Sequence, residues 1–282
     1  MAAAPSTALD LWRANEAQRV ILRSGCDAVD ELLGGGFRSG LLTEICGEAS
    51  AGKTQLCLQL LLQCGLPLEL GGLGGSACYV CTEGVGAVKR LHDLATSYAA
   101  QYGAMNRKRK RDAADRDGAD AFLDGIFVEQ IYTADELVEL LQTRLPTLLE
   151  EQQTKLVVID SIAAVFRLES TATVKDASER ARAMFYLANC MRILSAQYRV
   201  VFVLTNQVTG DFRDDPLGLA GTQAFKPALG LSWANCVNQR LVIRRGADAA
   251  RRRLEVAFAP HLPAAHTFFE ITRDGIRSTA AR

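Results

Sequence analysis

The segment GEASAGKTQLCLQL, Gly47–Leu60, constrains this chain more than any other. Its first eight residues match G-x-x-x-x-G-K-T, a loop whose glycines let backbone N–H groups turn inward around a phosphate chain. In such a loop Lys53 reaches the β- and γ-phosphates and Thr54 places its hydroxyl on Mg²⁺. The helix that starts there adds its positive N-terminal end. The predicted binding residues are Gly47, Glu48, Ala49, Ser50, Ala51, Gly52, Lys53, Thr54 and Gln55.

The sequence around the loop supplies the other parts of a phosphate site. Leu41–Gly47 reads as a short strand, and the residues after the loop read as a helix. Lys155–Ser161 is an apolar strand with Asp160 at its carboxyl end, where a carboxylate holds the metal through water. The strand in Ala77–Gly84 leads to Glu83, which would polarise the water that attacks the γ-phosphate. The alternatives are a capping Asp on an ordinary strand and a purely structural Glu.

Composition excludes several classes of protein. The 282 residues, 30.6 kDa, are enough for one large α/β core with or without a tail. Lys plus Arg and Asp plus Glu both number 32, so no overall basic field attracts nucleic acid, and any DNA contact must be local or shared with partners. No apolar stretch is long enough to span a membrane.

The eight cysteines occur without a signal peptide or a regular framework, which favours a reducing compartment. Cys78 and Cys81 have C-x-x-C spacing but lie within a predicted strand, so we interpret them as core residues on opposite faces. Cys46 and Cys57 are interpreted as core residues too. No His/Cys cluster completes a zinc site.

Two regions differ from the rest in composition. Residues 1–22 read as an N-terminal tail with one short amphipathic piece, followed by a core over 23–282. A densely charged insertion at about 103–120 is expected to be exposed and mobile. Within it, the five consecutive cations of NRKRKR, Asn106–Arg111, indicate a nuclear import signal or a local phosphate-binding patch. The alternative is a solvated loop whose cations are offset by nearby aspartates.

The order of elements predicts the fold class. Strands alternate with helices from the phosphate loop onward, which is typical of an α/β domain with a mostly parallel sheet and helices on both faces. The segments QRLVIRR, RRLEVAFA and HTFFEIT have no long helices between them and predict antiparallel C-terminal strands at one edge. Pro146 is expected to bend or end a helix. Ligands bind at the carboxyl ends of parallel strands, where Gly47, Glu83, Asp160 and Gln207 converge.

A set of longer motifs occurs in a fixed order along the chain. They are GCDAVDELLGGGFRSGLLTEICGEASAGKTQLCLQL, YVCTEG, LVVIDSIAAVFR, VLTNQVT, KPALGLSWANCVNQRL and APHLP. In this order they resemble the RecA-type recombinase family and, more closely, its eukaryotic recombination-repair paralogues. The similarity covers roughly residues 25–277. The pair LGLSWANCVNQR and FAPHLP is most similar to a plant-like version of one of these paralogues.

The resemblance implies a RecA-like P-loop NTPase core that binds ATP and Mg²⁺ between adjacent subunits, with single-stranded DNA along the oligomer axis. It implies Lys53 on the phosphates, Thr54 and Asp160 at the metal, and Glu83 as activator of the water. Gln207 resembles the residue that senses the γ-phosphate and relays it to a DNA loop; alternatively its amide satisfies a strand end. Arg90 resembles a residue near the adenine; alternatively it is an ordinary surface arginine.

The resemblance also implies two loops that face DNA, where Lys and Arg could neutralise phosphates and aromatic rings could stack on bases. The first follows Asp160 and the second follows Gln207. The second also contains three aspartates, which makes it a poor DNA clamp alone, and both could be solvated loops. The candidate contacts are Arg167, Lys175, Arg180, Arg182, Arg213 and Lys226, with Phe212 and Phe225 available for stacking.

Three departures from the family pattern favour an auxiliary paralogue. About 24 residues precede the core, without the Phe-x-x-Ala docking motif of strand-exchange members. Asn235 stands where those enzymes carry a His that contacts the neighbour's nucleotide. In the expected cap over that nucleotide, near Pro260 and Pro263, Phe258 and Ala259 replace the usual acidic residue.

The sequence therefore predicts an ATP-binding, weakly hydrolysing mediator of homologous recombination and double-strand-break repair, with DNA-dependent ATPase activity. Expected partners are another recombinase paralogue, the C paralogue first among them, the strand-exchange recombinase, and single-stranded or branched DNA. The expected location is the nucleus, with some protein in the cytoplasm. The alternatives are a filament-forming strand-exchange recombinase, a small-molecule P-loop kinase, and a subunit that binds nucleotide without hydrolysing it.

Overall fold

The computed structural model describes residues 7–106, 118–167, 174–210, 225–246 and 250–279. Most of the predicted charged insertion, including the cations at 107–111, lies outside these residues. So does Arg213 of the second predicted DNA loop. The long helix α4 (Ala87–Asn106) extends into the first residues assigned to the insertion.

A ten-stranded sheet forms the centre of the described part of the chain, in the order β12-β11-β10-β9-β3-β7-β6-β4-β5, with β8 paired to β7. Parallel pairs join β9 to β3, β3 to β7, β7 to β6, β6 to β4 and β4 to β5. The strands are β3 (Leu42–Gly47), β4 (Ser76–Cys81), β5 (Ile126–Gln130), β6 (Thr154–Asp160), β7 (Val201–Gly210), β8 (Phe225–Pro227), β9 (Gln239–Arg245), β10 (Arg251–Phe258), β11 (His266–Thr272) and β12 (Gly275–Ser278).

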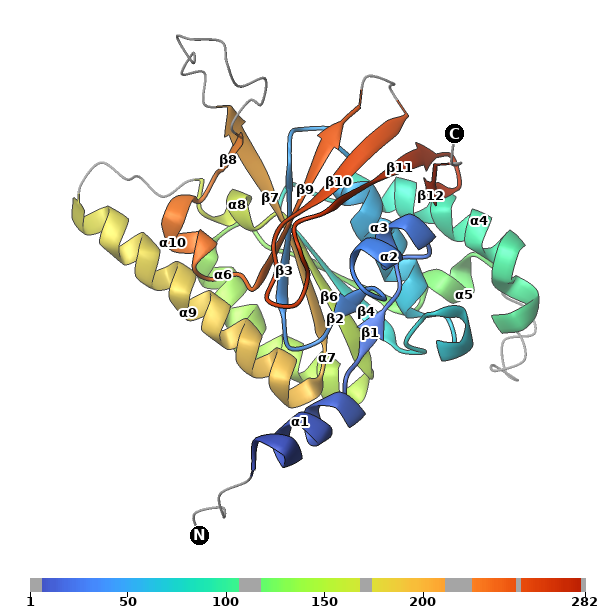
Figure 1. The fold of residues 1–282 in the computed structure, drawn as a ribbon, viewed down its shortest axis with the longest axis horizontal. Coiled ribbons are helices and arrows are strands. Elements are labelled where there is room, and N and C mark those ends of the chain that lie inside the picture. The colour runs from blue at the N-terminus through green and yellow to red at the C-terminus, as the bar shows by residue number, and fades with distance from the viewer. Residues whose placement is uncertain (1–6, 107–117, 168–173, 211–224, 247–249, 280–282) are drawn as a thin grey trace.

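Helices cover both faces of this sheet, as predicted (Figure 1). The apolar runs of β3 and β6 suit strands that are buried on both sides. One face packs against α2 (Asp27–Leu32), α3 (Lys53–Cys64), α4 and α5 (Asp120–Leu123). The other packs against α6 (Ala134–Glu139), α7 (Leu145–Glu151), α8 (Ile162–Val165), α9 (Val174–Tyr198) and α10 (Gly230–Ala234).

The cysteines of the C-x-x-C segment divide between these two faces. Cys78 belongs to the cluster under α9 and Cys81 to the cluster under α3. This is the alternation that strand geometry requires for positions three residues apart. The prediction that both are core residues is confirmed, as it is for the fully buried Cys46 and Cys57.

The C-terminal strands extend one edge of the sheet, as the sequence predicted. Strand β9 pairs in parallel with β3, and β10, β11 and β12 then follow in antiparallel order. The last strand, β12, was not predicted, because its four residues are too short to show a pattern. This arrangement places the β10–β11 strands beside the phosphate loop.

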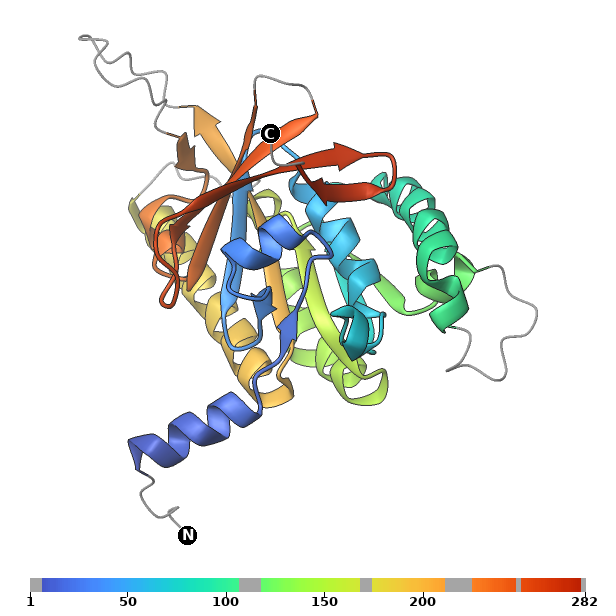
Figure 2. The ribbon, with the colours of Figure 1, turned by 45° about the vertical axis from the view of Figure 1, so that its right-hand side comes forward.

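The N-terminal segment contributes a small second sheet. Strand β1 (Ile21–Leu22) pairs with β2 (Phe37–Arg38), and Leu22 is fully buried. The first core strand thus begins within the segment that the sequence assigned to the tail. Before it, α1 (Ala8–Ala17) projects away from the body of the molecule in both views (Figures 1 and 2).

Pro146 does not end the helix in which it lies. Helical structure runs from Ala134 through a π-helical turn, Leu140–Arg144, into α7, where Pro146 occupies the first turn. Of the two outcomes predicted for Pro146, the helix does not end there, and the π-helical turn directly before the proline marks an irregularity in it.

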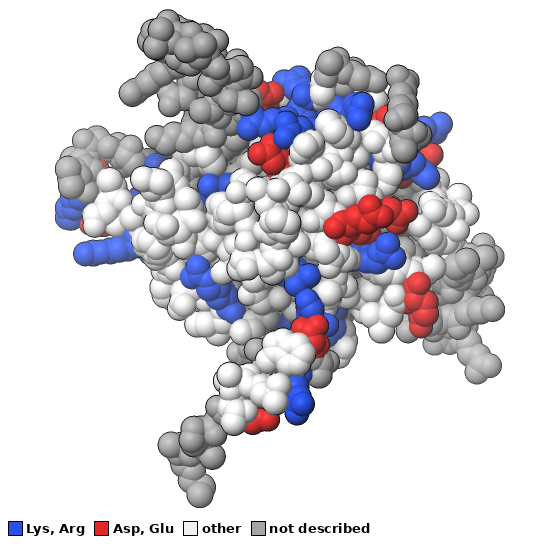
Figure 3. Space-filling view, viewed as in Figure 1, with Lys and Arg blue, Asp and Glu red and all other residues white. Residues whose placement is uncertain are grey.

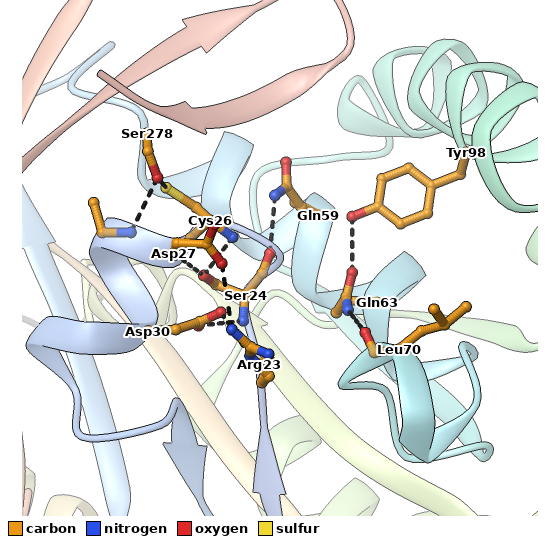
Figure 4. A network of polar contacts seen from close by, with 11 residues as sticks. Arg23, Ser24, Cys26, Asp27, Asp30, Gln59, Gln63, Leu70, Tyr98 and Ser278 are labelled. Carbon is orange, nitrogen blue, oxygen red and sulfur yellow. Dashed lines mark hydrogen bonds and ion pairs between the residues drawn. The ribbon is translucent and has the colours of Figure 1, made fainter. Parts of the chain in front are cut away.

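A network of hydrogen bonds connects the N-terminal segment to α3 (Figure 4). The backbone N–H of Ser24 donates to Asp30 at 2.6 Å, and Gln59 of α3 donates to the Ser24 carbonyl at 2.8 Å. Gln59 also accepts from the backbone N–H of Ile276 on β12 at 2.6 Å. Burial raises the pKa of the Asp30 carboxyl. Segments far apart in sequence are thus tied to the helix that carries the phosphate loop.

Within the described residues, no helix combines the length and apolar character needed to cross a membrane.

Candidate functional site

The predicted phosphate loop connects β3 to α3, as its motif requires. Two of its glycines have a steric reason to be glycine. A Cβ on Gly47 would stand 2.6 Å from the carbonyl oxygen of Ile243. Gly52 has φ +112° and a Cβ there would stand 2.6 Å from Ile271 Cδ1. The loop is therefore fitted closely between β9 and β11.

The amine of Lys53 lies over this loop. Its Nζ donates to the carbonyl oxygens of Gly47 at 2.7 Å and Glu48 at 2.8 Å. Only 8% of the residue is exposed, and burial lowers the pKa of its amine, opposed in part by the charge of Asp160. Among the described residues, no carboxylate oxygen lies within ion-pair distance of Nζ. A buried cation held only by carbonyls is suited to a bound anion.

Asp160 stands at the end of β6 and receives three hydroxyl groups. Thr54 of α3 donates to Oδ2 at 2.7 Å, Tyr79 of β4 donates to Oδ2 at 3.2 Å, and Thr205 of β7 donates to Oδ1 at 2.5 Å. Burial, and then the charge of Asp160, raise the pKa of the Tyr79 phenol, so it remains a donor. The predicted pair Thr54 and Asp160 is brought together. Tyr79 and Thr205 were not predicted.

Glu83 follows β4 at the rim of the same site and is half exposed. Its Oε1 accepts from Gln207 Nε2 at 3.1 Å and from Arg167 Nη2 at 2.5 Å. Gln207 is the last residue of β7 that pairs with β3, opposite Gly47. The structure thus brings together Gly47, Glu83 and Gln207 as predicted. It adds Arg167, which the sequence assigned to a DNA loop.

A pocket of about 540 Å³ opens beside the loop. Arg90 closes one side: it donates to Gln55 at 3.0 Å and to the carbonyls of Thr272 and Arg273 at 2.8 and 2.7 Å. The guanidinium of Arg90 is thus built into the wall rather than lying on an ordinary surface. The residues that line the pocket are Ser50, Gly52, Lys53, Thr54, Gln55, Arg90, Arg252, Ile271, Thr272 and Arg273.

Arg252 of β10 is a pocket residue that sequence reasoning missed. It is 9% exposed, and its Nε donates to the carbonyl of Ala51 in the phosphate loop at 2.9 Å. The run RRR, 251–253, was visible in the sequence, but only the pairing of β10 with β9 and β11 decides which arginine points inward. Arg252 brings a second cation to the loop.

A buried ion pair supports the site from behind. Glu44 of β3 is fully buried and accepts from Asn206 at 2.7 Å, Trp233 at 2.8 Å and Arg240 at 2.5 Å. Arg240 also lies 5.2 Å from the ring of Phe258. Glu44 is three residues before Gly47 and Asn206 is next to Gln207, so the pair fixes β3 against β7 where both reach the site.

The residues predicted for the first DNA loop divide between two elements. Arg167 follows α8, whereas Lys175, Arg180 and Arg182 lie on α9. The structure thus corrects the loop assignment of Lys175, Arg180 and Arg182, whereas Arg167 lies in the connection after α8. Lys175 lies 3.8 Å from Glu179 one helical turn away, and Arg180 stands over the ring of Phe166 at 5.8 Å. These side chains are therefore held on a helix face.

The second predicted DNA loop is partly strand. Lys226 lies in β8, where its backbone pairs with Thr209 of β7. The remaining residues of that loop, 211–224, lie outside the described part, and with them Arg213 and Phe212.

Basic side chains gather over the β9–β10 hairpin on the face seen in Figure 3. The ion pairs of this hairpin join Arg244 and Arg253 to Glu255 at 4.0 and 3.5 Å, and Arg245 to Glu48 of the phosphate loop at 3.5 Å. Arginines outnumber carboxylates along the two strands. This patch was not predicted, because a net charge of zero for the chain conceals local clusters.

The donor set agrees with a magnesium nucleotide. Thr54 and Asp160 offer a hydroxyl and a carboxylate at one point, which are ligands that Mg²⁺ accepts. Lys53 is a buried cation above backbone that only glycine permits. In the described ranges no group of three His, Cys, Asp or Glu side chains forms another metal site.

Comparison with known proteins gives a consistent picture. The family model described as Rad51 matches residues 15–279. The Arabidopsis thaliana DNA repair protein XRCC3 homolog is 32% identical over 92% of this chain and 93% of its own length. The Bos taurus DNA repair protein XRCC3 is 37% identical over 96% of this chain and 79% of its own length. The Homo sapiens DNA repair protein RAD51 homolog 2 is 28% identical, over 94% and 70% respectively.

Proposed function

The chain belongs to the Rad51 family, and on that premise we propose that it is an ATP-binding DNA repair protein that acts in homologous recombination. Its membership confirms the resemblance to recombination-repair paralogues that the motif order predicted, and the RecA-like fold confirms the predicted class. The specific activity, partners and site residues given below are our proposals.

The environment of Lys53 is the observation that carries ATP binding. An ammonium group that is nearly buried, and that contacts only carbonyl oxygens, gains most from an anion placed above the loop. The phosphate chain would lie along Gly47–Thr54, with Lys53 and Arg252 as the two cations and Arg90 at the wall of the pocket.

Thr54 and Asp160 would hold Mg²⁺, with Tyr79 and Thr205 orienting the carboxylate. The ion, when bound, supplies charge that stabilises negative phosphate oxygens. Glu83 would accept a proton from the attacking water, and Gln207 would orient Glu83 through Oε1. Because all of these groups are present, we propose slow, DNA-dependent hydrolysis of ATP.

DNA would contact the rim that carries Arg167 and, beyond it, the α9 cations Lys175, Arg180 and Arg182. The basic β9–β10 hairpin is a second candidate for phosphate contacts. We further propose a hetero-oligomer with another recombinase paralogue and a nuclear location, with residues 107–111 as the import signal. The relatives named above are DNA repair proteins, and this supports the proposed role in DNA repair.

Thermal unfolding with and without ATP–Mg²⁺ tests the proposal. A ligand at a hundredfold excess over its dissociation constant stabilises the folded state by about 2.7 kcal/mol. Lys53→Ala is expected to abolish this stabilisation, because backbone N–H groups alone cannot offset the phosphate charge. Lys89→Ala, an exposed lysine on α4, is the matched control and should retain it. If ATP–Mg²⁺ leaves the unfolding temperature of the parent chain unchanged, the proposed function is wrong.

A further inference from the structure

Arg167 and Gln207 contact the same carboxylate oxygen of Glu83. Both donate to Oε1, at 2.5 and 3.1 Å. The three residues come from three different connections: Glu83 follows β4, Arg167 follows α8, and Gln207 ends the parallel part of β7. The carboxylate assigned to the attacking water is thus paired with a cation in this structure.

The Arg167–Glu83 ion pair is exposed enough to exchange. Each side chain is 49% exposed, and pairs in such positions are weak because water screens them. A guanidinium also binds phosphate through charge-assisted hydrogen bonds. Arg167 stands at the rim that we propose for DNA. Its guanidinium can therefore bind either of two anions, the Glu83 carboxylate or a DNA phosphate. Binding to the DNA phosphate breaks the ion pair with Glu83.

We infer that Arg167 is a positioning residue that couples DNA binding to ATP hydrolysis through Glu83. Without DNA, Arg167 holds Oε1 and weakens Glu83 as a base. A DNA phosphate that takes Arg167 frees the carboxylate, and Gln207 keeps it oriented. The water oxygen then bonds to the γ-phosphorus, its proton passes to Glu83, and the bond to the β–γ bridging oxygen breaks to release ADP. The inference rests on the proposed function.

The competition can be measured without nucleotide, because coupling between two acceptors is reciprocal. If Glu83 restrains Arg167, then Glu83→Gln and Glu83→Ala should bind a fluorescent oligothymidylate roughly two- to fivefold more tightly than the parent chain. Arg167→Ala should bind it more weakly. In the double variant Glu83→Ala/Arg167→Ala, removal of Glu83 should have no further effect.

Glu129→Gln is the matched control for this cycle. Glu129 also pairs with an arginine, Arg144, at 3.0 Å, but on β5. The affinity of the Glu129→Gln variant for the oligothymidylate should equal that of the parent chain. If both Glu83 variants bind DNA no more tightly than the parent, the inference is overturned. A parent chain that binds no DNA at all overturns it too, because the coupling requires a phosphate that attracts Arg167.

Hydrolysis gives the second readout. Arg167→Ala should raise the DNA-free rate toward the DNA-stimulated rate of the parent, so that the ratio of the two rates falls toward one. Arg167→Lys should keep part of the DNA dependence, because it retains a cation. Arg13→Ala, an exposed arginine on α1, should leave both rates unchanged. Equal loss of rate with and without DNA in Arg167→Ala would instead make Arg167 a support for Glu83 and overturn the inference.

The two proposals fail separately. A parent chain that shows no stabilisation by ATP–Mg²⁺ removes the proposed function, while the DNA-binding cycle still tests the Arg167–Glu83 competition. A parent chain that binds ATP and DNA, but whose Glu83 variants show no gain in DNA affinity, removes only the inference.

Discussion

The hydroxyl of Thr54 donates a 2.7 Å hydrogen bond to Oδ2 of Asp160, joining the first turn of α3 to the end of β6 across 106 residues of sequence. Both groups belong to the predicted metal site, and both offer oxygen atoms, which Mg²⁺ prefers as ligands. Thr205 donates to the other carboxylate oxygen, Oδ1, and so helps to orient Asp160 for the contact with Thr54. The geometry of the proposed metal site thus depends on residues outside the phosphate-loop motif.

Thr205→Val should weaken the response to magnesium. The substitution keeps the shape of a fully buried side chain and removes the donor to Oδ1, so the carboxylate is oriented through Oδ2 alone, by Thr54 and Tyr79. Loss of such an outer-shell partner typically costs about 10–100-fold in metal affinity or activity. The measurement is the Mg²⁺ concentration that gives half of the maximal ATP binding. Thr143→Val, at an exposed helical position, is the control. An unchanged Mg²⁺ midpoint would remove Thr205 from the site.

Nucleotide affinity should fall as pH rises, because of Lys53. Burial lowers the pKa of its amine in the free protein, and bound phosphates would raise it again. Between these two pKa values binding takes up a proton, so affinity decreases with pH by at most about tenfold per pH unit. Titrations with a fluorescent ATP analogue from about pH 7 to about pH 9.5 would measure this. Below the lowered pKa the affinity should be constant.

Lys53→Arg is the matched variant for that titration. Its guanidinium stays charged throughout this range, so the pH dependence should disappear even though the overall affinity drops with the altered geometry. A parent affinity that is flat over the whole range would show that the Lys53 amine does not titrate on binding.

Arg240→Met should destabilise the fold strongly. Glu44 is fully buried and loses its charge partner, although Asn206 and Trp233 still donate to it. Removal of one member of a buried pair costs about 3–5 kcal/mol. Urea unfolding would measure the loss. Arg245→Met on the same strand removes an exposed arginine 3.5 Å from Glu48, and should change the free energy of unfolding by no more than about 0.5 kcal/mol. Equal effects in the two variants would contradict a special role for the buried pair.

Asp30 should give stability a definite pH dependence. Burial raises the pKa of its carboxyl in the folded state above the ordinary value that it has in the unfolded chain. Between these values the folded state holds more protons than the unfolded state, so the contribution of Asp30 falls as pH rises through that window. Asp30→Asn lacks this titration. The free energy of unfolding of the parent minus that of Asp30→Asn should therefore decrease with rising pH.

Urea unfolding of both proteins at several pH values from about 4 to 7 would test the sign. Asp27→Asn removes an exposed carboxylate from the same helix and controls for the loss of a charge. A difference that grows with pH would mean that the hydrogen bond from Ser24 and the charge of Arg23 outweigh burial at Asp30.

The strands and helices that position the site were predictable because their patterns are local. A continuous apolar run identified β6, and the glycine spacing identified the loop before α3. Tyr79 and Thr205 were not predictable as partners of Asp160, because a buried tyrosine or threonine in a strand has no distinctive pattern. They meet Asp160 through the register of β4, β6 and β7, which is a property of the assembled sheet.

The start of α9 was missed for a different reason. The residues before Met184 are rich in Ser, Thr and charge, which favours a loop when judged locally. In the structure the buried residues Met184, Leu187 and Met191 pack against the sheet, and the helix extends back to Val174. Tertiary packing therefore outweighed local preference, and it moved Lys175 from the predicted loop onto a helix.

Thiol labelling should distinguish one cysteine from the other seven. The chain has eight cysteines, all free thiols, and of these only Cys190 is partly exposed. Burial raises the pKa of Cys64 and of Cys78 to about 12, and reaction requires both access and thiolate. At about pH 8 the native protein should release roughly one equivalent of thionitrobenzoate from Ellman's reagent, and about eight after unfolding in guanidinium. Cys190→Ser should abolish the native signal and lower the unfolded count by one. Rapid reaction of several thiols in the native Cys190→Ser protein would mean that the sheet faces carrying Cys78 and Cys81 are open to solvent, and the packing described for both would be wrong.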